Sequence, residues 1–395
     1  MNKNILHTGV QKFIAENTNT DIASILLKKS PFSTVSNKEL AEQIEAKKKC
    51  KNKLPTWFNT PGIYYPNKLN IEQTSSEKTA KYKASLLKGK TVLDITGGFG
   101  VDAYYFSLVM KKVFHCEINT ALSTIVTQNL NTLKVNNITT IAEDGMEYLN
   151  TKNTQWDCIY IDPSRRNDRK GKVFMLSDCL PDVPKKLDFL FCKSPHIIIK
   201  TSPLLDFSIG ISELKNVNEI HVLAVGNEVK ELLWVLEKNY TKPIAIKTTN
   251  LTKNGEEHFN FLLEDEKKCT PEYSLPLQYL YEPNSAILKS GAFKTLSKEY
   301  DLPKFHVNTH LYTHKNLKNF PGRVFKIDSI HPYNKKVLKK LRISKANVAI
   351  RNFPETVAQI RKKHTIKDGG SLYLFFTTDY ENNLTLLICS KVNKV

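Results

Sequence analysis

A strand-like run that ends in a glycine-rich turn is the segment of this sequence best suited to chemistry. The stretch VLDITGGFGVDA occupies residues 92–103 and places Gly98, Gly100 and Ala103 in the spacing of a nucleotide-binding turn. Glu117 follows 19 residues after Gly98. Glycines let the backbone approach a nucleotide closely, and a carboxylate after the next strand can accept hydrogen bonds from ribose hydroxyls. The pattern therefore predicts a site for a nucleotide-containing cofactor.

Two acidic residues in the same stretch narrow the choice of cofactor. Asp94 closes the predicted strand, and Asp102 lies at the start of the predicted helix. A carboxylate at Asp94 would repel the pyrophosphate of a dinucleotide, whereas the α-ammonium group of S-adenosylmethionine would find a partner there. Aspartate also favours a helix start for structural reasons alone, so both residues keep that second interpretation. We expect S-adenosylmethionine, with a nicotinamide dinucleotide as the rival.

Carboxylates recur at the ends of successive predicted strands. They are Asp94, Glu117, Asp144 in IAEDGMEYL and Asp162 in CIYIDPSRR, and they are separated by 23, 27 and 18 residues. Each separation has room for a helix and a strand, and ligands bind outside the carboxyl ends of strands in an open parallel sheet. The four side chains are thus predicted to border one crevice, with Glu117 facing a ribose and Asp144 facing an adenine amino group.

A family resemblance rests on four segments: VLDITGGFGVDA, HCEIN, AEDGMEYL and YIDPSRR. Together they resemble the successive motifs of class I S-adenosylmethionine-dependent methyltransferases. The turn is similar to that of small-subunit ribosomal RNA guanine-N2 methyltransferases, and DPSRR looks like a variant of the D/N-P-P-Y/F/W/R motif of enzymes that methylate exocyclic amines. The resemblance implies a set of cofactor-binding residues: Asp94, Thr96, Gly98, Gly100, Asp102, Glu117, Ile118, Asp144 and Gly145.

For the chemistry, the resemblance implies that Asp162, Pro163 and Arg165 are catalytic. The Asp162 carboxylate and the Pro163 carbonyl would accept the two N–H bonds of a purine amine and aim its lone pair at the methyl group. The target base would have to leave its stack. This sequence departs from the motif, because Ser164 replaces the second proline and Arg165 replaces the base-stacking aromatic residue. The expected substrate-binding residues are Ser164, Arg166, Arg169 and Lys200, and a loop that caps the sheet is the alternative interpretation of the two adjacent arginines.

Smaller signals flank this constellation. In LNIEQTSSEKTAKYKA, Gln73 and Ser76 are candidate contacts of a segment that folds over the methionine end of the cofactor, although a plain helix N-cap explains Ser76 equally well. His306, His310 and His314 recur every fourth residue, but their β-branched and aromatic surroundings indicate strand. We therefore expect no metal site there.

The elements that must position these residues change along the chain. Residues 1–70 are predicted to be helical, with a capping-type start in SNKELAEQ. From residue 71, helical stretches alternate with strand-like runs, which indicates a mostly parallel sheet covered by helices. These runs are TVLDI, KVFHCEI, ITTIAED, WDCIYID, HIIIKTS, EIHVLAV, PIAIKT and FNFLLED.

After residue 270 the alternation breaks. YLYEPNSAILKSGAFK, FPGRVFKI and ANVAIRNFPETVAQIRKK resemble the C-terminal part of bacterial methyltransferase-like proteins that carry ferredoxin-like and THUMP-like domains. We predict an α/β protein: a Rossmann-like class I methyltransferase sheet with an N-terminal helical segment and small C-terminal α+β modules. The expected boundaries are 1–70 helical, 71–270 methyltransferase, 271–322 ferredoxin-like and 323–395 THUMP-like.

Composition limits the class of protein. The 395 residues include 58 Lys and Arg against 39 Asp and Glu, a formal net charge of +19, which favours a polyanionic partner over an acidic protein. A lysine-rich solvated surface is the other interpretation of that charge. No apolar run reaches the ~18 residues of a spanning helix, the N-terminus lacks a secretory pattern, and seven Cys without CxxC pairing indicate reduced thiols. We expect a cytoplasmic protein.

The sequence therefore predicts an S-adenosylmethionine-dependent methyltransferase that acts on ribosomal or transfer RNA, at N2 of guanine or N6 of adenine, without a metal or a membrane. Three rivals stay open. They are an NAD-dependent oxidoreductase, a non-catalytic RNA-binding or ribosome-assembly factor with a relic methyltransferase fold, and a methyltransferase for protein or small molecules.

Overall fold

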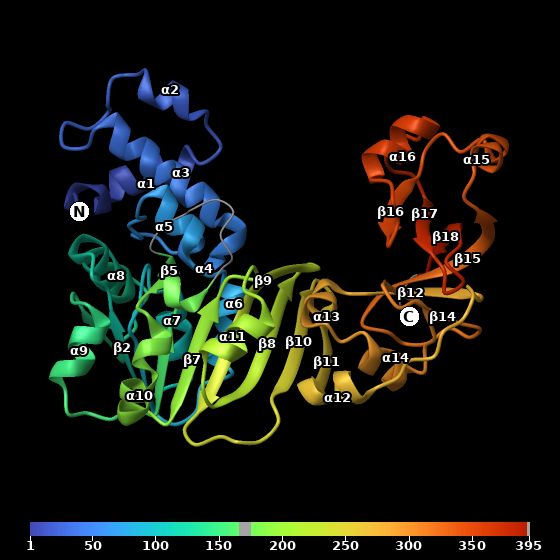
Figure 1. Ribbon diagram of the computed structural model, residues 1–395. Helices are drawn as coiled ribbons and strands as arrows, with labels where there is room; N and C mark the ends of the chain where they lie inside the picture. The colour runs from blue at the N-terminus through green and yellow to red at the C-terminus, as the bar shows by residue number, and fades with distance from the viewer. Residues whose placement is uncertain (166–174, 393–395) are drawn as a thin grey trace. The chain divides into compact units, whose positions relative to one another are not determined.

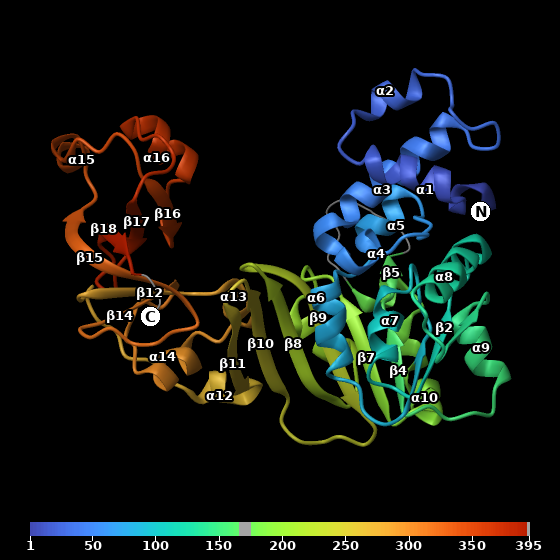
Figure 2. The ribbon, with the colours of Figure 1, turned by 180° about the vertical axis from the view of Figure 1, so that it is seen from behind.

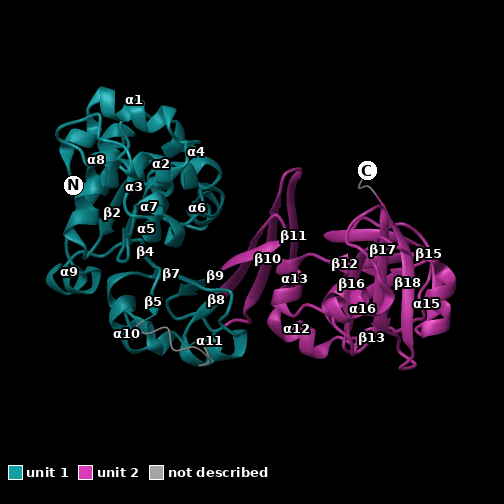
Figure 3. Ribbon diagram, turned by 90° about the horizontal axis from the view of Figure 1, so that it is seen from above, with its two compact units in different colours: residues 1–218, 232–241 teal, residues 219–231, 242–395 magenta. Residues whose placement is uncertain are grey.

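The computed structural model describes residues 1–165 and 175–392 of the chain (Figure 1). The chain forms two compact units. Unit 1 comprises residues 1–218 and 232–241, and unit 2 comprises residues 219–231 and 242–395 (Figure 3). In the described ranges, no helix combines the length and the apolar character needed to cross a membrane.

Unit 1 begins with helices that pack on the sheet region. After the 3-10 turn η1 (Lys3–Leu6) they are α1 (Thr8–Glu16), α2 (Ile22–Leu26), α3 (Asn37–Lys53), α4 (Pro55–Asn59), α5 (Lys68–Gln73) and α6 (Glu77–Ala84). A capping box between Ser36 and Glu39 begins α3, which confirms the prediction from SNKELAEQ. Trp57 on α4 lies 6.3 Å from the Phe99 ring and 5.0 Å from the Tyr104 ring, between centroids. These helices thus share a hydrophobic core with the glycine-rich turn.

The described sheet of unit 1 has five parallel strands and one reversed strand, in the order β3-β2-β1-β4-β7-β9. Figures 1 and 2 show it from opposite sides, with β2, β7 and β9 labelled in both. The parallel strands are β1 (Thr91–Asp94), β2 (Lys112–Cys116), β3 (Ile138–Ile141), β4 (Cys158–Ile161) and β7 (His196–Thr201). The helices between them are α7 (Val101–Ser107), α8 (Thr120–Thr132), α9 (Gly145–Thr151), α10 (Val183–Lys193) and α11 (Phe207–Glu213). All residues of β4 are buried, as its apolar sequence CIYI predicts. The predicted α/β class and parallel sheet are confirmed.

The sequence pattern did not mark the reversed strand. Segment ELLWVLE belongs to β9 (Glu228–Glu237), which pairs antiparallel with β7. Its Leu and Glu residues favour a helix, but Leu232 to Leu236 are buried on both faces of the sheet. Burial in the sheet outweighs the local preference here.

The remaining small elements of unit 1 follow β4. Strand β5 (Ser164–Arg165) pairs antiparallel with β6 (Cys179–Leu180), and the short 3-10 turn η2 (Leu176–Asp178) precedes β6. The two-residue ladder fixes the chain directly after Asp162 and Pro163.

Unit 2 contains a three-stranded ladder and a curved sheet. In the ladder, β8 (Val217–Val225) runs parallel to β10 (Ala245–Thr252), which pairs antiparallel with β11 (Gly255–Leu262). The second sheet has the order β13-β14-β12-β15-β18-β17-β16. Its strands are β12 (Tyr279–Pro283), β13 (Lys304–His306), β14 (Thr309–His314), β15 (Gly322–Pro332), β16 (Asn347–Arg351), β17 (Leu372–Thr378) and β18 (Leu384–Lys391).

Helices accompany the second sheet: α12 (Leu263–Lys268), α13 (Ser285–Ser290), α14 (Lys294–Tyr300), α15 (Lys335–Leu341) and α16 (Val357–His364). The sheet curls, because β14 also contacts β16 from the opposite end of the strand order. Leu280, Phe325 and Phe375 belong to the apolar cluster inside this curve. His306, His310 and His314 lie on β13 and β14, which confirms the strand prediction for that segment.

Candidate functional site

The switch point of the unit 1 sheet lies between β1 and β4. The chain continues from β1 to β2 and β3 on one side, whereas β4 and β7 lie on the other side. Ligands of open α/β sheets bind at such a point, outside the carboxyl ends of the strands. Asp94 ends β1, and Asp162 directly follows β4, so these two predicted site residues lie at the switch point.

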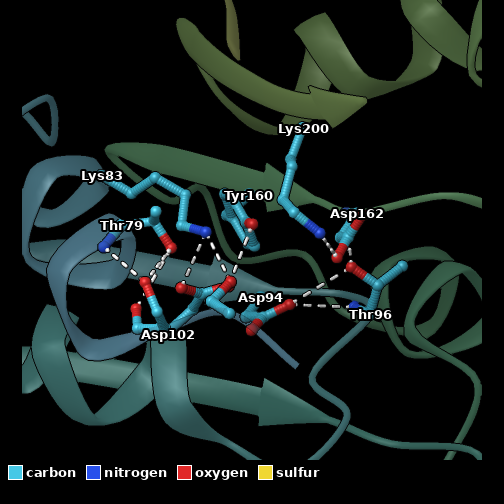
Figure 4. Close-up of polar contacts among 10 residues, drawn as sticks. Thr79, Lys83, Asp94, Thr96, Asp102, Tyr160, Asp162 and Lys200 are labelled. Atoms are coloured by element: carbon cyan, nitrogen blue, oxygen red, sulfur yellow. Dashed lines mark hydrogen bonds and ion pairs between the residues drawn. The ribbon is translucent and has the colours of Figure 1, made fainter. Parts of the chain in front are cut away.

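Thr96 links the two aspartates (Figure 4). The Thr96 backbone N–H donates to Asp94 Oδ1 at 3.0 Å, and the Thr96 hydroxyl donates to the same oxygen at 3.4 Å. The hydroxyl oxygen also accepts from the Asp162 backbone N–H at 2.7 Å. One side chain therefore fixes the ends of β1 and β4 relative to each other.

The glycine-rich turn adopts the backbone conformation that its sequence predicts. Gly98 and Gly100 have φ of +57° and +76°, and Gly100 caps α7. A Cβ at Gly97 would lie 2.2 Å from Nε2 of the buried His115. The Gly98 N–H donates to Glu117 Oε2 at 2.9 Å, which draws the turn to the end of β2. A larger residue cannot replace these glycines without moving the turn.

The Asp94 carboxyl is almost completely buried, with 1% of its surface exposed. Burial raises its pKa well above the usual range, and the negative charges of Asp102, Asp162 and Glu117 raise it further, although the Thr96 N–H lowers it. This end of the sheet therefore concentrates negative charge. A cation bound here would favour the ionised form of Asp94.

The ends of β2 and β3 carry three further predicted site residues, Glu117, Ile118 and Asp144. Glu117 accepts from the Asn119 N–H at 2.8 Å, and the adjacent Ile118 leaves 69% of its apolar side chain exposed. Asp144 is the N-cap of α9, where its Oδ1 accepts two backbone N–H bonds. A Cβ at Gly145 would lie 2.4 Å from the Ile95 carbonyl oxygen, so this glycine lets α9 approach the end of β1.

Asp102 belongs to a buried polar network and not to the sheet edge. Its carboxylate pairs with the fully buried Lys83 Nζ at 3.0 Å and accepts from the Ser75 hydroxyl at 2.8 Å and the Tyr160 hydroxyl at 3.1 Å (Figure 4). Lys83 also donates to Ser75 at 2.6 Å. The network ties the segment before α6 to α7 and β4, so its ion pair has a structural role.

The upstream segment contains the helix N-cap that its sequence predicts. Ser76 is the N-cap of α6, and its hydroxyl accepts from the Thr79 N–H at 3.2 Å. Gln73 is the last residue of α5 and is exposed. Ser75, between them, is buried in the Asp102 network.

The predicted catalytic residues lie at the end of β4. Lys200, from β7, donates to Asp162 Oδ2 and forms an ion pair with it, with side-chain exposures of 16% and 34% (Figure 4). Pro163 is buried, Ser164 is exposed, and Arg165 is half-buried in the β5–β6 ladder. Arg166 and Arg169 lie outside the described residues.

Sequence reasoning missed Ser75, Lys83, Tyr160 and His115. Lys83 is one of several lysines in SEKTAKYKA, and its partner Asp102 is 19 residues away. His115 could have been found, because it lies near the end of β2, two residues before Glu117. Both of its ring nitrogens are buried and have no hydrogen-bond partner in the described part of the chain.

The residues at the sheet edge fit the cofactor that the sequence predicts. Carboxylates at Asp94 and Glu117 suit an ammonium group and a ribose diol, and the exposed Ile118 can cover a planar base. The close approaches at Gly97 and Gly145 leave backbone, not side chains, along the glycine turn and the start of α9. The charge of this set is opposite to that which a pyrophosphate requires.

Comparison with solved structures gives a match to the whole chain. A crystal structure of a protein described as a "putative methyltransferase" from Porphyromonas gingivalis W83 is 32% identical, with a TM-score of 0.90, and the match covers 99% of this chain and 99% of that one. A Streptococcus mutans protein described in the same words, in complex with SAH, is 12% identical over 41% of this chain and 96% of its own, with a TM-score of 0.30. Another match is the M. jannaschii tRNA m1G37 methyltransferase, 13% identical over 42% and 51% of the two chains, with a TM-score of 0.30. TM-scores at that level carry no argument about this chain.

Two family models match the C-terminal part. Residues 279–321 match a ferredoxin-like domain, and residues 322–391 match a THUMP domain-like family. No curated protein matches this sequence. The ferredoxin-like and THUMP-like modules that the sequence predicts are confirmed.

Proposed function

This chain belongs to the same family as the Porphyromonas gingivalis protein, and from that premise we propose that it is an S-adenosylmethionine-dependent methyltransferase that modifies an exocyclic purine amine in RNA. The observation that carries the proposal is the Thr96 link between Asp94 and Asp162 at the switch point of the sheet. The link holds the Asp94 carboxyl, to which we assign the ammonium group of the cofactor, beside Asp162 of the resembled amine-methylating motif.

In this proposal Asp94 binds the ammonium group of the cofactor, Glu117 binds the ribose hydroxyls, and Ile118 packs on the adenine. When bound, S-adenosylmethionine supplies a methyl group on a positively charged sulfur that is already activated for transfer. The residues therefore accelerate the reaction by positioning the amine and the cofactor and by their electrostatic field. They need not generate a strong nucleophile.

Asp162 has the geometry to orient an amine. Lys200 engages Oδ2 of its carboxylate, and no described residue donates to Oδ1. That second oxygen can accept one N–H bond of the amine while the buried Pro163 supplies its carbonyl for the other, as the family resemblance implies. Two accepted N–H bonds localise the nitrogen lone pair, and Oδ1 can take the proton that the nitrogen loses once the new N–C bond has formed.

Charge supports RNA as the substrate class. The chain carries a formal net charge of +19, and a polyanion releases counterions when basic residues neutralise its phosphates. Arg165 occupies the place of the base-stacking aromatic residue in the resembled motif. Its planar guanidinium group can stack on a base.

The test is methyl transfer from labelled S-adenosylmethionine to total RNA from a strain that lacks this gene. We compare the wild-type protein with Asp162→Ala, because asparagine would keep an acceptor oxygen and is itself allowed at this position of the resembled motif. Asp188→Ala is the matched control, because Asp188 is 87% exposed and pairs only with the exposed Lys215 in the described part of unit 1. We expect Asp162→Ala to lower transfer at least a hundredfold with cofactor affinity unchanged within twofold.

Two outcomes would overturn the proposal. Asp162→Ala that transfers methyl groups at the wild-type rate would remove Asp162 from catalysis. Wild-type protein that binds RNA but neither binds the cofactor nor transfers a methyl group would instead identify a non-catalytic RNA-binding factor.

A further inference from the structure

A charged cluster in unit 2 has no role in the proposed methyl transfer. It lies in the curved sheet, where β12 belongs to the ferredoxin-like segment and β15 and β16 belong to the THUMP-like segment. Glu282 on β12 is buried, with 2% exposure, and contacts one arginine through each carboxylate oxygen. Arg323 Nε donates to Oε2 at 2.6 Å, and Arg351 Nη2 donates to Oε1. Two arginines that lie 41 and 69 positions after Glu282 in the sequence thus meet at its carboxylate.

Backbone packing places Arg323 beside the glutamate. Arg323 and Glu282 are direct partners in the β12–β15 ladder. At the preceding residue, Gly322, a Cβ would lie only 2.2 Å from the Glu282 carbonyl oxygen. The strands can approach this closely only because residue 322 is glycine.

The two guanidinium groups retain donors toward solvent. Each has five N–H donors. Among the described contacts, Arg323 uses Nε and Nη2 on Glu282, and Arg351 uses Nη2 on Glu282 and Nη1 on the Ile350 carbonyl. The side chains of Arg323 and Arg351 remain 41% and 34% exposed. They are therefore held in place and still open to a ligand.

The cluster has an excess of positive charge. One arginine would neutralise Glu282, so the second leaves a net charge of +1 at a partly buried position. Burial, together with the positive charges of Lys304 and Arg351, lowers the pKa of His310 to about 4. Residues 322–391 contain fourteen Lys and Arg against five Asp and Glu. An anion is the ligand that would balance such a site.

We propose that Arg323 and Arg351, held by Glu282, bind a phosphodiester group of an RNA strand. Arginine presents parallel N–H donors that match two oxygens of a phosphate, and a pair of arginines fixed in advance loses little side-chain entropy on binding. This inference rests on the proposed RNA substrate and assigns it a contact in the C-terminal part of the chain. It differs from general attraction by exposed lysines, because it depends on two particular side chains.

The test compares two substitutions that each remove one positive charge from the same module. Arg351→Gln removes a proposed phosphate contact, and the control Arg361→Gln removes a guanidinium that pairs with the exposed Asp368. Binding of a fluorescently labelled 20-nucleotide RNA of mixed sequence is measured by anisotropy from 50 to 300 mM salt. We expect Arg351→Gln to bind about tenfold more weakly at 100 mM salt, with a slope of log affinity against log salt that is less steep by about 0.7. We expect Arg361→Gln to bind within twofold of the wild type.

Equal weakening by both substitutions, or no weakening by either, would overturn the inference. Since Arg351→Gln could unfold the sheet, the wild-type protein provides an independent measurement. Phenylglyoxal modifies exposed arginines, and mass spectrometry counts the modified residues with and without the same RNA. We expect RNA to protect Arg323 and Arg351 but not Arg361, and unchanged modification of the first two would refute the proposal.

The two proposals can fail separately. If Arg351→Gln binds RNA like the wild type while the wild type still transfers methyl groups, only the phosphate site is wrong. If the wild type transfers no methyl group but Arg351→Gln still loses RNA, the methyltransferase assignment is wrong and the phosphate site stands. Binding of polyglutamate as tightly as RNA would also overturn the inference, because it would identify an acidic protein as the partner.

Discussion

The buried Asp94 carboxyl makes two properties of the protein depend on pH in opposite directions. Burial raises its pKa in the folded state well above the ordinary aspartate value of 3.8. Between that value and the folded-state pKa, the folded protein holds a proton that the unfolded chain has released. The free energy of unfolding of the ligand-free protein therefore falls as pH rises through this range. A bound cation prefers the ionised carboxylate, so, if Asp94 binds the cofactor as we propose, we expect the affinity for S-adenosylmethionine to rise over the same range.

Asp94→Asn separates these effects. Asparagine keeps the Oδ1 acceptor for the Thr96 N–H, which lies 3.0 Å away, but it carries no charge at any pH. We expect the variant to be more stable than the wild type at pH 8 without ligand and to lose this part of the pH dependence. A hydrogen bond to a charged group contributes about 1.5–3 kcal/mol, so the cofactor is expected to bind roughly ten- to a hundredfold more weakly.

Urea unfolding from pH 5 to 9 measures the stability, and calorimetric titration with S-adenosylmethionine measures the affinity. Asp188→Asn, on the exposed surface of unit 1, is the control for loss of one carboxylate. The reasoning is wrong if Asp94→Asn is less stable than the wild type at pH 8. It is equally wrong if the variant binds the cofactor within twofold of the wild type.

Three further substitutions test other parts of the site. Lys83→Met leaves the Asp102 carboxylate buried without its ammonium partner at 3.0 Å. We expect urea unfolding to show that the free energy of unfolding falls by about 3–5 kcal/mol. A fall below about 1 kcal/mol would mean that the ion pair does not stabilise the fold. Gly97→Ala directs a methyl group to within 2.2 Å of His115, so we expect a lower melting temperature. Adding His115→Ala is expected to restore part of that loss. An unchanged melting temperature in Gly97→Ala would show that the turn moves freely. Ile118→Ser changes a side chain that is 69% exposed, so we expect an unchanged melting temperature. We expect cofactor binding, measured by calorimetry, to be about five- to thirtyfold weaker. Unchanged affinity would remove Ile118 from the site.

The parts of the fold that the sequence predicts correctly are those with a local physical cause. Gly98 and Gly100 mark the turn because their positive φ angles disfavour other residues. Asp94 and Asp162 could be placed at one edge because the carboxyl ends of parallel strands share that edge. Whether these side chains bind the cofactor and the base stays a prediction.

The parts that sequence reasoning missed depend on contacts between distant segments. The burial of Lys83 follows from Asp102 and Tyr160, which belong to other elements, and nothing in its own helix distinguishes it from the exposed Lys81. The reversed strand β9 forms because its neighbour β7 supplies a buried partner, against the helix preference of its leucines. Side-chain pairs such as Lys200 with Asp162 likewise require the order of the strands, which composition and spacing do not give.

The ladder between β12 and β15 separates two meanings of the word domain. The family models meet between residues 321 and 322, where recognisable sequence ancestry changes. The hydrogen-bonded sheet continues across that border, because β12 before it pairs antiparallel with β15 after it. The pairing runs from Tyr279 opposite Lys326 to Pro283 opposite Gly322. A truncation at residue 321 would expose the backbone edge of β12, and unpaired edges of this kind promote aggregation. The two segments can be told apart by descent, but they fold, and must be expressed, as a single piece.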